Sequence, residues 1–278
     1  MTRIDPTYPR SPRTGLLSAV PTGVPADMHV FADGAAWAPI GVPAAGSTVV
    51  VCGSTADRAA PTNPDARAAG PLVAWSAYAC ATIGVPDDER DARALARLEA
   101  GLSAAIAGEW ASGTVGAGVS GSPLTLAENV DVVTLAAGNV LNSAWAFMQV
   151  DGVLTRRLGN VGGLIAVVPE VLDMIRSANL VDRAGDQWVS PNGNLVVADG
   201  GFTGDGPADM ATASTSWIHG VDIPTILLGS AFTVSDAAST VDRGTNDRTV
   251  WAARPFIIEW DATVHVAVKV DQGVTPEP

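Results

Sequence analysis

VPDDERDARALARLEAGLSAAIAGEW, residues 85–110, is the most regular stretch of the chain. Pro86 stands where a helix would begin, and three acidic residues follow it in the first turn, where they complement the helix macrodipole. Apolar side chains then recur at spacings of three and four residues, which places on one helix face Leu95, Leu98, Leu102, Ile106 and Trp110. The stretch therefore predicts a helix over 86–110, about 36 Å long at 1.5 Å per residue, as the longest element of the chain.

Shorter patterns on both sides of this helix predict strands. Runs rich in apolar and β-branched residues lie at 28–37, 47–54, 71–84, 163–169, 214–222 and 225–234. Asn192-Gly193 within QWVSPNGNLVVADG (187–200) is a strong hairpin signal. Residues 248–271, RTVWAARPFIIEWDATVHVAVKVD, alternate apolar and polar side chains, and this alternation predicts a closing pair of strands.

Two helical regions and two irregular regions complete the pattern. We expect residues 126–158 to be mainly helical, and we expect a further helix to start at Pro169. Residues 1–27 are proline-rich without a periodic pattern, which indicates an extended arm. The polar stretch between 54 and 70 is long for a connection in a compact domain and indicates a projecting loop. Together these elements predict an α+β fold.

The composition argues against several classes of protein. With 278 residues, 47% of them apolar and 16% charged, the chain can form a substantial core and is not typical of a disordered protein. No apolar run approaches the roughly 20 residues that span a bilayer. A net charge of −13 argues against a surface evolved to grip nucleic acid, which needs clustered Lys and Arg. The N-terminal residues lack the apolar segment of a secretory signal, so we expect a cytoplasm-like compartment.

Cysteines and glycines offer no convincing site. Cys52 and Cys80 are too few for a disulfide framework and lack the spacing of metal ligands, so we expect buried free thiols. Gly116, Gly118 and Gly121 have the spacing of a dinucleotide fingerprint, but a helix precedes them where the fingerprint needs a strand. We expect a mobile loop at these glycines.

The histidines are weak candidates for catalysis. His29, His219 and His265 are scattered singly along the chain. His219 with Asp222 would still need a nucleophile on an elbow-like turn, and the chain contains no G-x-S-x-G motif. His265 falls on the same face of its predicted strand as Lys269, so we expect it at the solvent or at an interface.

The acidic segment Asp199–Asp209 has a spacing similar to that of a calcium-binding loop. It lacks the ligand rhythm and the closing glutamate of such a loop, so we expect it to be solvated and flexible. Paired carboxylates at Asp87 and Asp88 are explained by the helix start.

The order of the elements resembles a known fold. Three stretches carry the resemblance, at 71–113, 163–201 and 245–271. They are similar to the E-loop return strand with the spine helix, to the axial-domain strand, helix and hairpin, and to the closing strands of the peripheral domain in the major capsid protein of tailed bacteriophages. This is the Hong Kong 97-type fold, which encapsulins share, and the nearest similarity is to short capsid proteins of phages infecting actinobacteria.

The resemblance implies a division of the chain into five segments. These are an N-terminal arm (1–27), an E-loop region (28–75), a peripheral domain that contains the spine helix (76–130), an axial domain (131–244), and the closing strands of the peripheral domain with the C-terminal tail (245–278).

The resemblance also implies a structural protein and not an enzyme, with no catalytic residue, cofactor or metal. Copies would assemble in the host cytoplasm into pentamers and hexamers, and these would form the icosahedral shell of a virion. The shell would enclose double-stranded DNA without sequence-specific contacts. The partners would be further copies of the chain, a separate scaffolding protein, a portal and a decoration protein, with no membrane involved.

The residues singled out for structure or assembly are Trp37, Arg67, Leu98, Leu102, Trp110, Arg156 and Arg157. Trp37 is expected at a contact between subunits, with a core position as the alternative, whereas Trp110 and Trp251 are expected in the core. For the adjacent pair Arg156 and Arg157, a salt bridge to a neighbouring subunit and a chemical role are equal alternatives. Some family members cross-link subunits through an E-loop lysine. Because the only lysine here is Lys269, outside that loop, we expect this chemistry to be absent.

Alternatives from other classes remain. The first is an encapsulin-like compartment shell or a minor capsid subunit. The second is a small α+β enzyme that uses His219 and Asp222 or the Asp199–Asp209 segment. The third is a phage tail or adhesin module. Particle size discriminates between a shell and an enzyme, because an enzyme would form only small oligomers.

Overall fold

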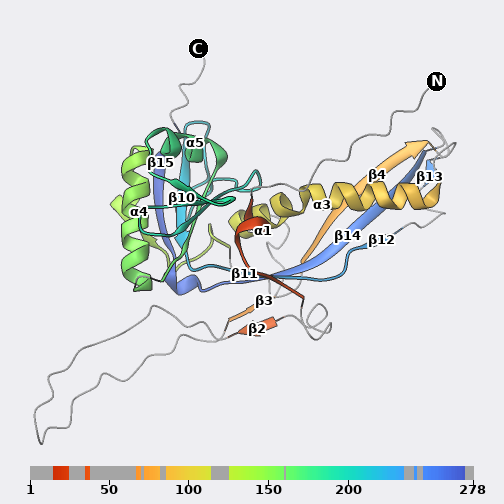
Figure 1. The fold of residues 1–278 in the computed structure, drawn as a ribbon, viewed down its shortest axis with the longest axis horizontal. Coiled ribbons are helices and arrows are strands. Elements are labelled where there is room, and N and C mark those ends of the chain that lie inside the picture. Colours follow the sequence, from red (N-terminus) through yellow and green to blue (C-terminus); the bar gives the residue numbers. More distant parts are fainter. Residues whose placement is uncertain are drawn as a thin grey trace, which may run out of the picture.

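The computed structural model describes residues 15–24, 35–37, 67–69, 72–81, 86–113, 125–159, 161–234, 241–242 and 247–272. For residues 35–37, 67–69, 79–81, 241–242 and 247–248 it describes the backbone only. Figure 1 shows an elongated part, in which a long helix lies along long strands, and a compact part, in which a second sheet is flanked by shorter helices. Several sequence predictions lie outside the described residues, namely the strand at 47–54, most of the strand at 28–37, His29, Cys52, the side chain of Cys80, and Gly116, Gly118 and Gly121.

Helix α3 (Asp87–Ser112) is the long helix of the elongated part. It confirms the predicted helix and extends it by two residues at the C-terminal end. Arg93 forms an ion pair with Glu89, one turn earlier. The helix ends at Gly113, whose φ of 66° lies in the left-handed region that glycine adopts without strain.

The apolar face of α3 packs against a sheet, as its spacing predicts. Leu98 and Leu102 are 2% exposed, and Ile106 and Trp110 are fully buried. Trp110 packs edge-on against Trp260, with 5.8 Å between the ring centroids. The helix thus contributes its apolar stripe to the main core.

A six-stranded sheet supports α3. Its centre is the antiparallel pair of β4 (Leu72–Ala81) and β14 (Asp247–Glu259), in register from Asp247 opposite Ala81 to Phe256 opposite Leu72. β14 also pairs with three shorter strands, and β1 pairs in parallel with the first of them. These strands are β11 (Thr225–Leu228), β12 (Phe232–Val234), β13 (Val241–Asp242) and β1 (Thr22–Gly23).

A seven-stranded sheet forms the compact part. Its strand order is β5-β15-β10-β6-β9-β8-β7. The strands are β5 (Val133–Thr134), β15 (Val266–Asp271), β10 (Thr215–Val221), β6 (Leu164–Val167), β9 (Leu195–Ala198), β8 (Gln187–Val189) and β7 (Asp182–Ala184). Every residue of β6 is buried, and β6 runs parallel to β9, which agrees with the continuous apolar run that predicted a buried strand.

Two helices accompany this sheet. α4 (Ser143–Leu158) packs against β10 and β15, and α5 (Pro169–Ser177) starts at the predicted proline. The side chain of Asn142 caps α4 by accepting a hydrogen bond from the Ala144 N–H at 3.0 Å. The predicted hairpin is β8–β9, and Gly193 adopts a φ of 84° in its turn.

The segment before α4 corrects one prediction. Residues 126–142 form turns, the short strand β5 and the 3-10 helix η1 (Leu135–Gly138) instead of an α-helix. Ala136 and Ala137 have φ values of 52° and 51°, which a right-handed helix does not allow. The helical region therefore begins only at Ser143.

The closing strands correct a second prediction. β14 belongs to the six-stranded sheet and β15 to the seven-stranded sheet, so the closing pair does not form one unit. In addition, β11 and β12 pair with β14, although the sequence analysis grouped 225–234 with the segment that ends at residue 244. The sheets therefore cross the expected boundary at residue 244.

The N-terminal segment corrects a third. Residues 15–24 are packed and not extended: α1 (Leu16–Ala19) contacts α3 with Leu16 fully buried, and β1 follows at the edge of a sheet. Separately, β2 (Ala35–Trp37) and β3 (Arg67–Ala69) form an antiparallel pair in which Trp37 is the register partner of Arg67.

Candidate functional site

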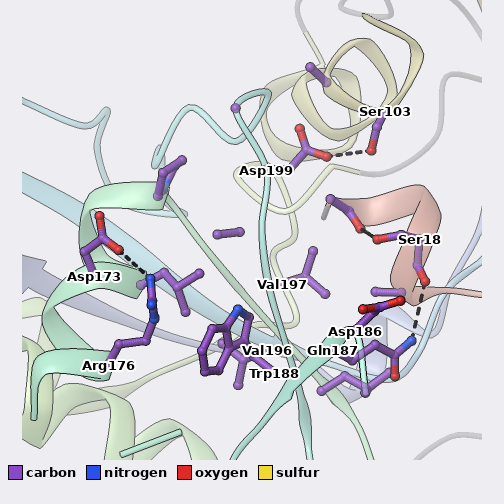
Figure 2. Close-up of a pocket in the computed structure, with 18 of the residues that line it drawn as sticks. Ser18, Ser103, Asp173, Arg176, Asp186, Gln187, Trp188, Val196, Val197 and Asp199 are labelled. Atoms are coloured by element: carbon purple, nitrogen blue, oxygen red, sulfur yellow. Dashed lines mark hydrogen bonds and ion pairs between the residues drawn. The ribbon is translucent and has the colours of Figure 1, made fainter. Parts of the chain in front are cut away.

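A cleft of about 550 Å³ lies between four segments that are far apart in the sequence. Its walls come from α1, from the middle of α3, from α5 and from the strands β7 to β9. Figure 2 shows Ser18 and Gln187 on one side and Asp173 and Arg176 on the other, with Trp188 between them. The cleft thus forms where the N-terminal segment meets the two larger parts of the fold.

Asp199 closes one end of the cleft, and its carboxylate is fully engaged. It accepts hydrogen bonds from the Leu16 N–H at 2.9 Å, from the Ser103 hydroxyl at 2.6 Å and from the Gly201 N–H at 3.0 Å. A Cβ at Gly201 would lie 1.9 Å from the carbonyl oxygen of Ala104, so only glycine lets this loop approach α3 so closely. Asp199 therefore ties α1 and α3 together.

Trp188 forms the aromatic wall of the cleft. The guanidinium of Arg176 lies 4.6 Å from its ring centroid, and that of Arg183 lies at 5.9 Å. Each arginine also has a carboxylate partner, with Arg176 at 3.1 Å from Asp173 and Arg183 at 3.6 Å from Asp186. The charges at this wall occur in pairs, so the cleft presents little net charge there.

These contacts indicate positioning and not chemistry. The buried carboxylate holds backbone and hydroxyl donors, and the arginines stack on an aromatic ring. Among the described residues, no group of three or more His, Cys, Asp or Glu side chains is arranged to hold a metal ion. The cleft is best understood as a joint that fixes α1 against the rest of the subunit.

A second cluster lies in the core beside β10 and β15. The Nδ1 of His219 lies 2.9 Å from the Nε2 of His265, and the Nδ1 of His265 lies 3.0 Å from the amide nitrogen of Asn129. At the other end, the Nε2 of His219 lies 2.9 Å from the carbonyl oxygen of Asp205. Both rings are buried. The structure thus corrects the expectation of a solvent-facing His265 and joins two histidines that the sequence shows as isolated.

The direction of each hydrogen bond in this series follows from the groups at its two ends, the Asp205 carbonyl and the Asn129 side-chain amide. A carbonyl oxygen can only accept, so the His219 Nε2 carries the proton and its Nδ1 accepts one from the His265 Nε2. The Nδ1 of His265 then accepts from the amide of Asn129, which also donates to the Ala262 carbonyl at 2.7 Å. Both histidines are neutral in this arrangement.

Burial makes the neutral state of the pair strongly favoured. It lowers the pKa of His219 to about 4, although the Asp205 carbonyl opposes the shift. It also holds the pKa of His265 well below its usual value, and the nearby His219 and Arg157 lower that pKa further. Asp222 contacts neither ring in any hydrogen bond of the described residues and instead accepts from the Ile223 N–H at 2.8 Å. The structure does not assemble the His219–Asp222 pair of the enzyme alternative.

We expect the subunit to lose stability when the pH falls below about 6.5, the ordinary pKa of histidine. The unfolded chain binds protons on both residues below that pH, whereas the folded chain does not bind one on His219 until about pH 4. The free energy of unfolding should therefore fall by about 1.4 kcal/mol per pH unit for each histidine. Urea unfolding between pH 7.5 and pH 5 measures this slope.

The double variant His219→Gln and His265→Gln is the control for this prediction. It should lose most of the slope between pH 6.5 and pH 5, because the carboxylates titrate mainly at lower pH. An unchanged slope in the double variant would assign the pH dependence to other groups.

The acidic segment 199–209 lies on β10 and β15, with Asp209 exposed at its end. The Asp209 carboxylate accepts from the indole N–H of Trp217 at 2.9 Å and forms an ion pair with Lys269. The hydrogen bond from Lys269, followed by that from Trp217, lowers the pKa of Asp209. A Cβ at Gly206 would lie 2.2 Å from the Trp217 ring, so this glycine allows the loop to lie directly on β10.

The residues singled out by sequence fall into three groups. Leu98, Leu102 and Trp110 lie on the face of α3 that packs into the main core, as expected. Arg157 donates to the Thr263 carbonyl at 2.7 Å within the same subunit, while Arg156 is exposed on α4. Trp37 and Arg67 have no described side chains, so their expected contacts between subunits stay predictions (residues 35–37 and 67–69 are described as backbone only).

Exposed tryptophans were missed by the sequence analysis. Trp251 is not in the core: it is exposed and lies against Trp75, with 5.0 Å between the ring centroids. Trp145 and Met148 are likewise exposed, on α4. No local pattern separates these tryptophans from buried ones, because the sheet and helix faces that carry them are defined only by the packing of distant segments.

No protein-family model matches the chain, and no curated protein is significantly similar to it. Solved structures nevertheless share its fold over nearly the whole chain. A structure of Mycobacterium phage Ogopogo matches with a TM-score of 0.57 at 13% identity, covering 97% of this chain and 96% of that chain. The capsid of Ralstonia phage GP4 matches with a TM-score of 0.55 at 10% identity, covering 99% and 96%.

An encapsulin complex from Synechococcus elongatus matches as well, with a TM-score of 0.56 at 9% identity, covering 100% of this chain and 95% of that chain. These likenesses confirm the predicted α+β capsid fold. Among the described residues, no helix is both long and apolar enough to cross a membrane.

Proposed function

We propose that the chain is the major capsid protein of a tailed bacteriophage, a structural subunit that assembles with copies of itself into an icosahedral shell. The observation that carries this proposal is the fold likeness, which spans at least 95% of both chains in comparisons with phage and encapsulin structures. Proteins of one fold can differ in function, so the surfaces of the subunit must also suit assembly.

The architecture of the subunit supports assembly. α3 on the β4–β14 pair makes a rigid elongated part, and α4 with α5 closes the compact part. Large apolar side chains remain exposed on both, among them Trp75, Trp145 and Trp251. Exposed tryptophans at such density are typical of protein interfaces, where they act as anchors. In a closed ring of identical subunits, each such patch must meet a different patch of the neighbour.

In this proposal the segments take the roles that the resemblance implies, except that β15 joins the axial domain and β11 and β12 join the peripheral domain. The compact part is the axial domain, the elongated part is the peripheral domain, residues 28–75 hold the E-loop, and the arm precedes Gly15. Pentamers and hexamers of the chain enclose double-stranded DNA, with a scaffolding protein, a portal and a decoration protein as partners. The net charge of −13 agrees with a wall along which packaged DNA slides without sticking.

Light scattering after size-exclusion chromatography, with negative-stain images of the leading peak, tests the proposal. We expect particles of megadalton mass or discrete pentamers and hexamers. If the purified protein is a monomer or dimer, the candidate scaffolding protein is added. A subunit that still forms no particles with its scaffold would contradict the proposal and favour an enzyme or another small oligomer.

An encapsulin-like compartment is the second candidate, because the TM-score of the encapsulin structure, 0.56, lies between those of the two phage structures, 0.55 and 0.57. Particles from the native source discriminate between the two. Double-stranded DNA that survives nuclease treatment identifies a phage head, whereas a defined protein cargo without DNA identifies a compartment.

A further inference from the structure

The turn between β8 and β9, residues 190–194, contains the only Asn-Gly step of the chain, at Asn192 and Gly193. Asparagine is a chemically labile residue, and a following glycine makes it more so, because no Cβ hinders the approach of the glycine nitrogen to the asparagine side chain. The step is accessible to water. Both residues are exposed, and nothing lies within 4 Å of a Cβ placed on Gly193.

The reaction open to such a step is deamidation. Hydroxide removes the proton of the Gly193 N–H, and the nitrogen then attacks the side-chain carbonyl carbon of Asn192. The new N–C bond closes a succinimide ring, and the side-chain nitrogen leaves as ammonia with a proton from water, which regenerates hydroxide. Water opens the ring at either carbonyl and leaves aspartate or isoaspartate at position 192. Nothing is oxidised or reduced, and water is the only co-reactant.

Both reacting groups are held by hydrogen bonds in the folded chain. The Gly193 N–H donates to the Ser190 carbonyl at 2.9 Å, so its proton is not free for hydroxide. The side-chain amide of Asn192 donates to the Asp151 carboxylate at 2.7 Å. That carboxylate is itself fixed, because the side chains of Ser190 and Asn194 also donate to it. Attack needs a deprotonated nitrogen aligned with the side-chain carbon, so these contacts must break first.

We propose that Asn192 is a deamidation site and that the Asp151 carboxylate holds it in an unreactive arrangement, so that the modification proceeds only while the β8–β9 turn is open. Asp151 acts by positioning the side-chain amide of Asn192 and takes no part in the reaction. The proposal does not depend on the shell, because it concerns the chemistry of a single folded chain.

The product of the reaction should keep the turn open. Aspartate at position 192 places a second carboxylate where an amide had donated to Asp151, and like charges in contact repel each other. Isoaspartate in addition lengthens the backbone within the turn. Because deamidation is not reversed, each chain would carry a lasting record of the time that its turn has spent open.

Peptide mass spectrometry of the full chain after incubation at mildly alkaline pH tests the proposal. Deamidation replaces an NH2 group by OH, and the other asparagines, none of which precedes glycine, serve as internal references. We expect Asn192 to deamidate about tenfold or more slowly in the folded chain than in the same chain unfolded in urea, because a closed segment reacts only through its open form. Equal rates in the two states would overturn the proposal.

Hydrogen exchange at Gly193 sharpens this test without any substitution. Exchange and deamidation both begin with loss of the Gly193 N–H proton, so folding should slow the two reactions by the same factor, within about threefold. If deamidation of Asn192 were slowed much less than exchange, the reaction would occur in the closed turn. The proposal would then be wrong.

Asp151→Ala tests the role of the carboxylate. We expect Asn192 to deamidate about tenfold or more faster in this variant than in the unmodified chain, because the turn opens more often. Leu154→Ala is the matched control, since Leu154 is fully buried on the same helix and its side chain forms no hydrogen bond with the turn. An equal acceleration in both variants would assign the protection to overall stability. Slower deamidation in Asp151→Ala would make the carboxylate an assistant of the reaction. Either result overturns the proposal.

Two further variants test the effect of the product. Asn192→Asp reproduces one product, whereas Asn192→Gln keeps an amide that can donate to Asp151. We expect residues 187–198 to exchange hydrogen about tenfold faster in Asn192→Asp than in the unmodified chain, and Asn192→Gln to exchange at nearly the unmodified rate. Equally slow exchange in both variants would show that the turn closes again after the reaction, which would contradict the lasting record.

Discussion

Replacing Leu102 with Asp is expected to abolish cooperative folding of the chain and, with it, the shell assembly that we propose. Leu102 is 2% exposed in the stripe of α3 that packs on the main core. Removing a buried leucine side chain costs about 2–5 kcal/mol, and a carboxylate without a partner in the same place costs several more. This sum is comparable to the whole stability of a typical domain, about 5–15 kcal/mol. Leu98→Asp should behave in the same way.

Ala105→Asp is the matched control for this prediction. It introduces the same side chain three residues further along α3, at an exposed position. We expect it to change the free energy of unfolding by less than about 1 kcal/mol, since it disturbs no packing. Circular dichroism and urea unfolding compare the variants, and electron microscopy shows the particles. A Leu102→Asp subunit with a normal cooperative transition would mean that α3 does not pack as described.

The elements that the sequence predicts well are those fixed by neighbours in the chain. α3 follows from an apolar spacing that one helix face satisfies by itself, and its start and end follow from Pro86 and Gly113. The β8–β9 hairpin follows from Asn192-Gly193 in the same local way. The order of such elements was enough to indicate the capsid fold, even though the solved structures compared here share only 9–13% of their residues with the chain.

The contact between His219 and His265 could not be predicted from local sequence patterns. The sequence places His265 on the face of its strand that carries Lys269, and a lone alternating strand gives no sign that this face is covered. In the structure the segment 205–209 lies over it, with the Asp205 carbonyl 2.9 Å from the His219 Nε2 and Asp209 paired with Lys269. His265 instead points into the core, where it meets His219 from 46 residues earlier.

Trp251 was misplaced for a different reason. A large aromatic residue in a long strand normally indicates a core position, and its neighbours Val250 and Ala252 are indeed buried. Trp251 lies on the side of β14 that α3 does not cover, where it is 40% exposed. The pattern of one strand does not show which of its two faces a distant helix covers.

The cleft could not be predicted because long-range contacts create it. The sequence predicts a flexible acidic loop at Asp199, yet its carboxylate is held by Leu16, Ser103 and Gly201 from three segments. Only the path of the whole chain brings these donors together, and no spacing in the sequence encodes it.

Replacing Asp151 with Ala is expected to produce the second large loss of stability. The carboxylate of Asp151 is buried on α4 and accepts hydrogen bonds from the side chains of Ser190, Asn192 and Asn194. The hydrogen bonds from the side-chain amides of Asn192 and Asn194 to this carboxylate are both 2.7 Å long. Asn194 in turn accepts from the Gly163 N–H at 2.8 Å, so one carboxylate joins α4, the β8–β9 turn and the start of β6.

The alanine variant leaves the buried donors of Ser190 and Asn194 without their acceptor, while Asn192 is exposed and can turn to water. Each buried donor that loses its partner costs about 1–3 kcal/mol, so we expect a total loss of about 2–5 kcal/mol in urea unfolding. Asp151→Asn should also destabilise, because its amide group would face donors with a donor. Hydrogen exchange should accelerate across residues 187–198, which carry Trp188 at the cleft wall.

Asp173→Ala is the control for Asp151, since it removes an exposed carboxylate that pairs with Arg176 at 3.1 Å on the same helix. Exposed pairs of this kind contribute less than about 1 kcal/mol, and residues 187–198 should exchange as in the unmodified chain. If the Asp151 and Asp173 variants unfolded at the same urea concentration, the buried carboxylate would not be the link between α4 and the hairpin. The stability of the compact part would then rest on the apolar contacts of α4 with β10 and β15 alone.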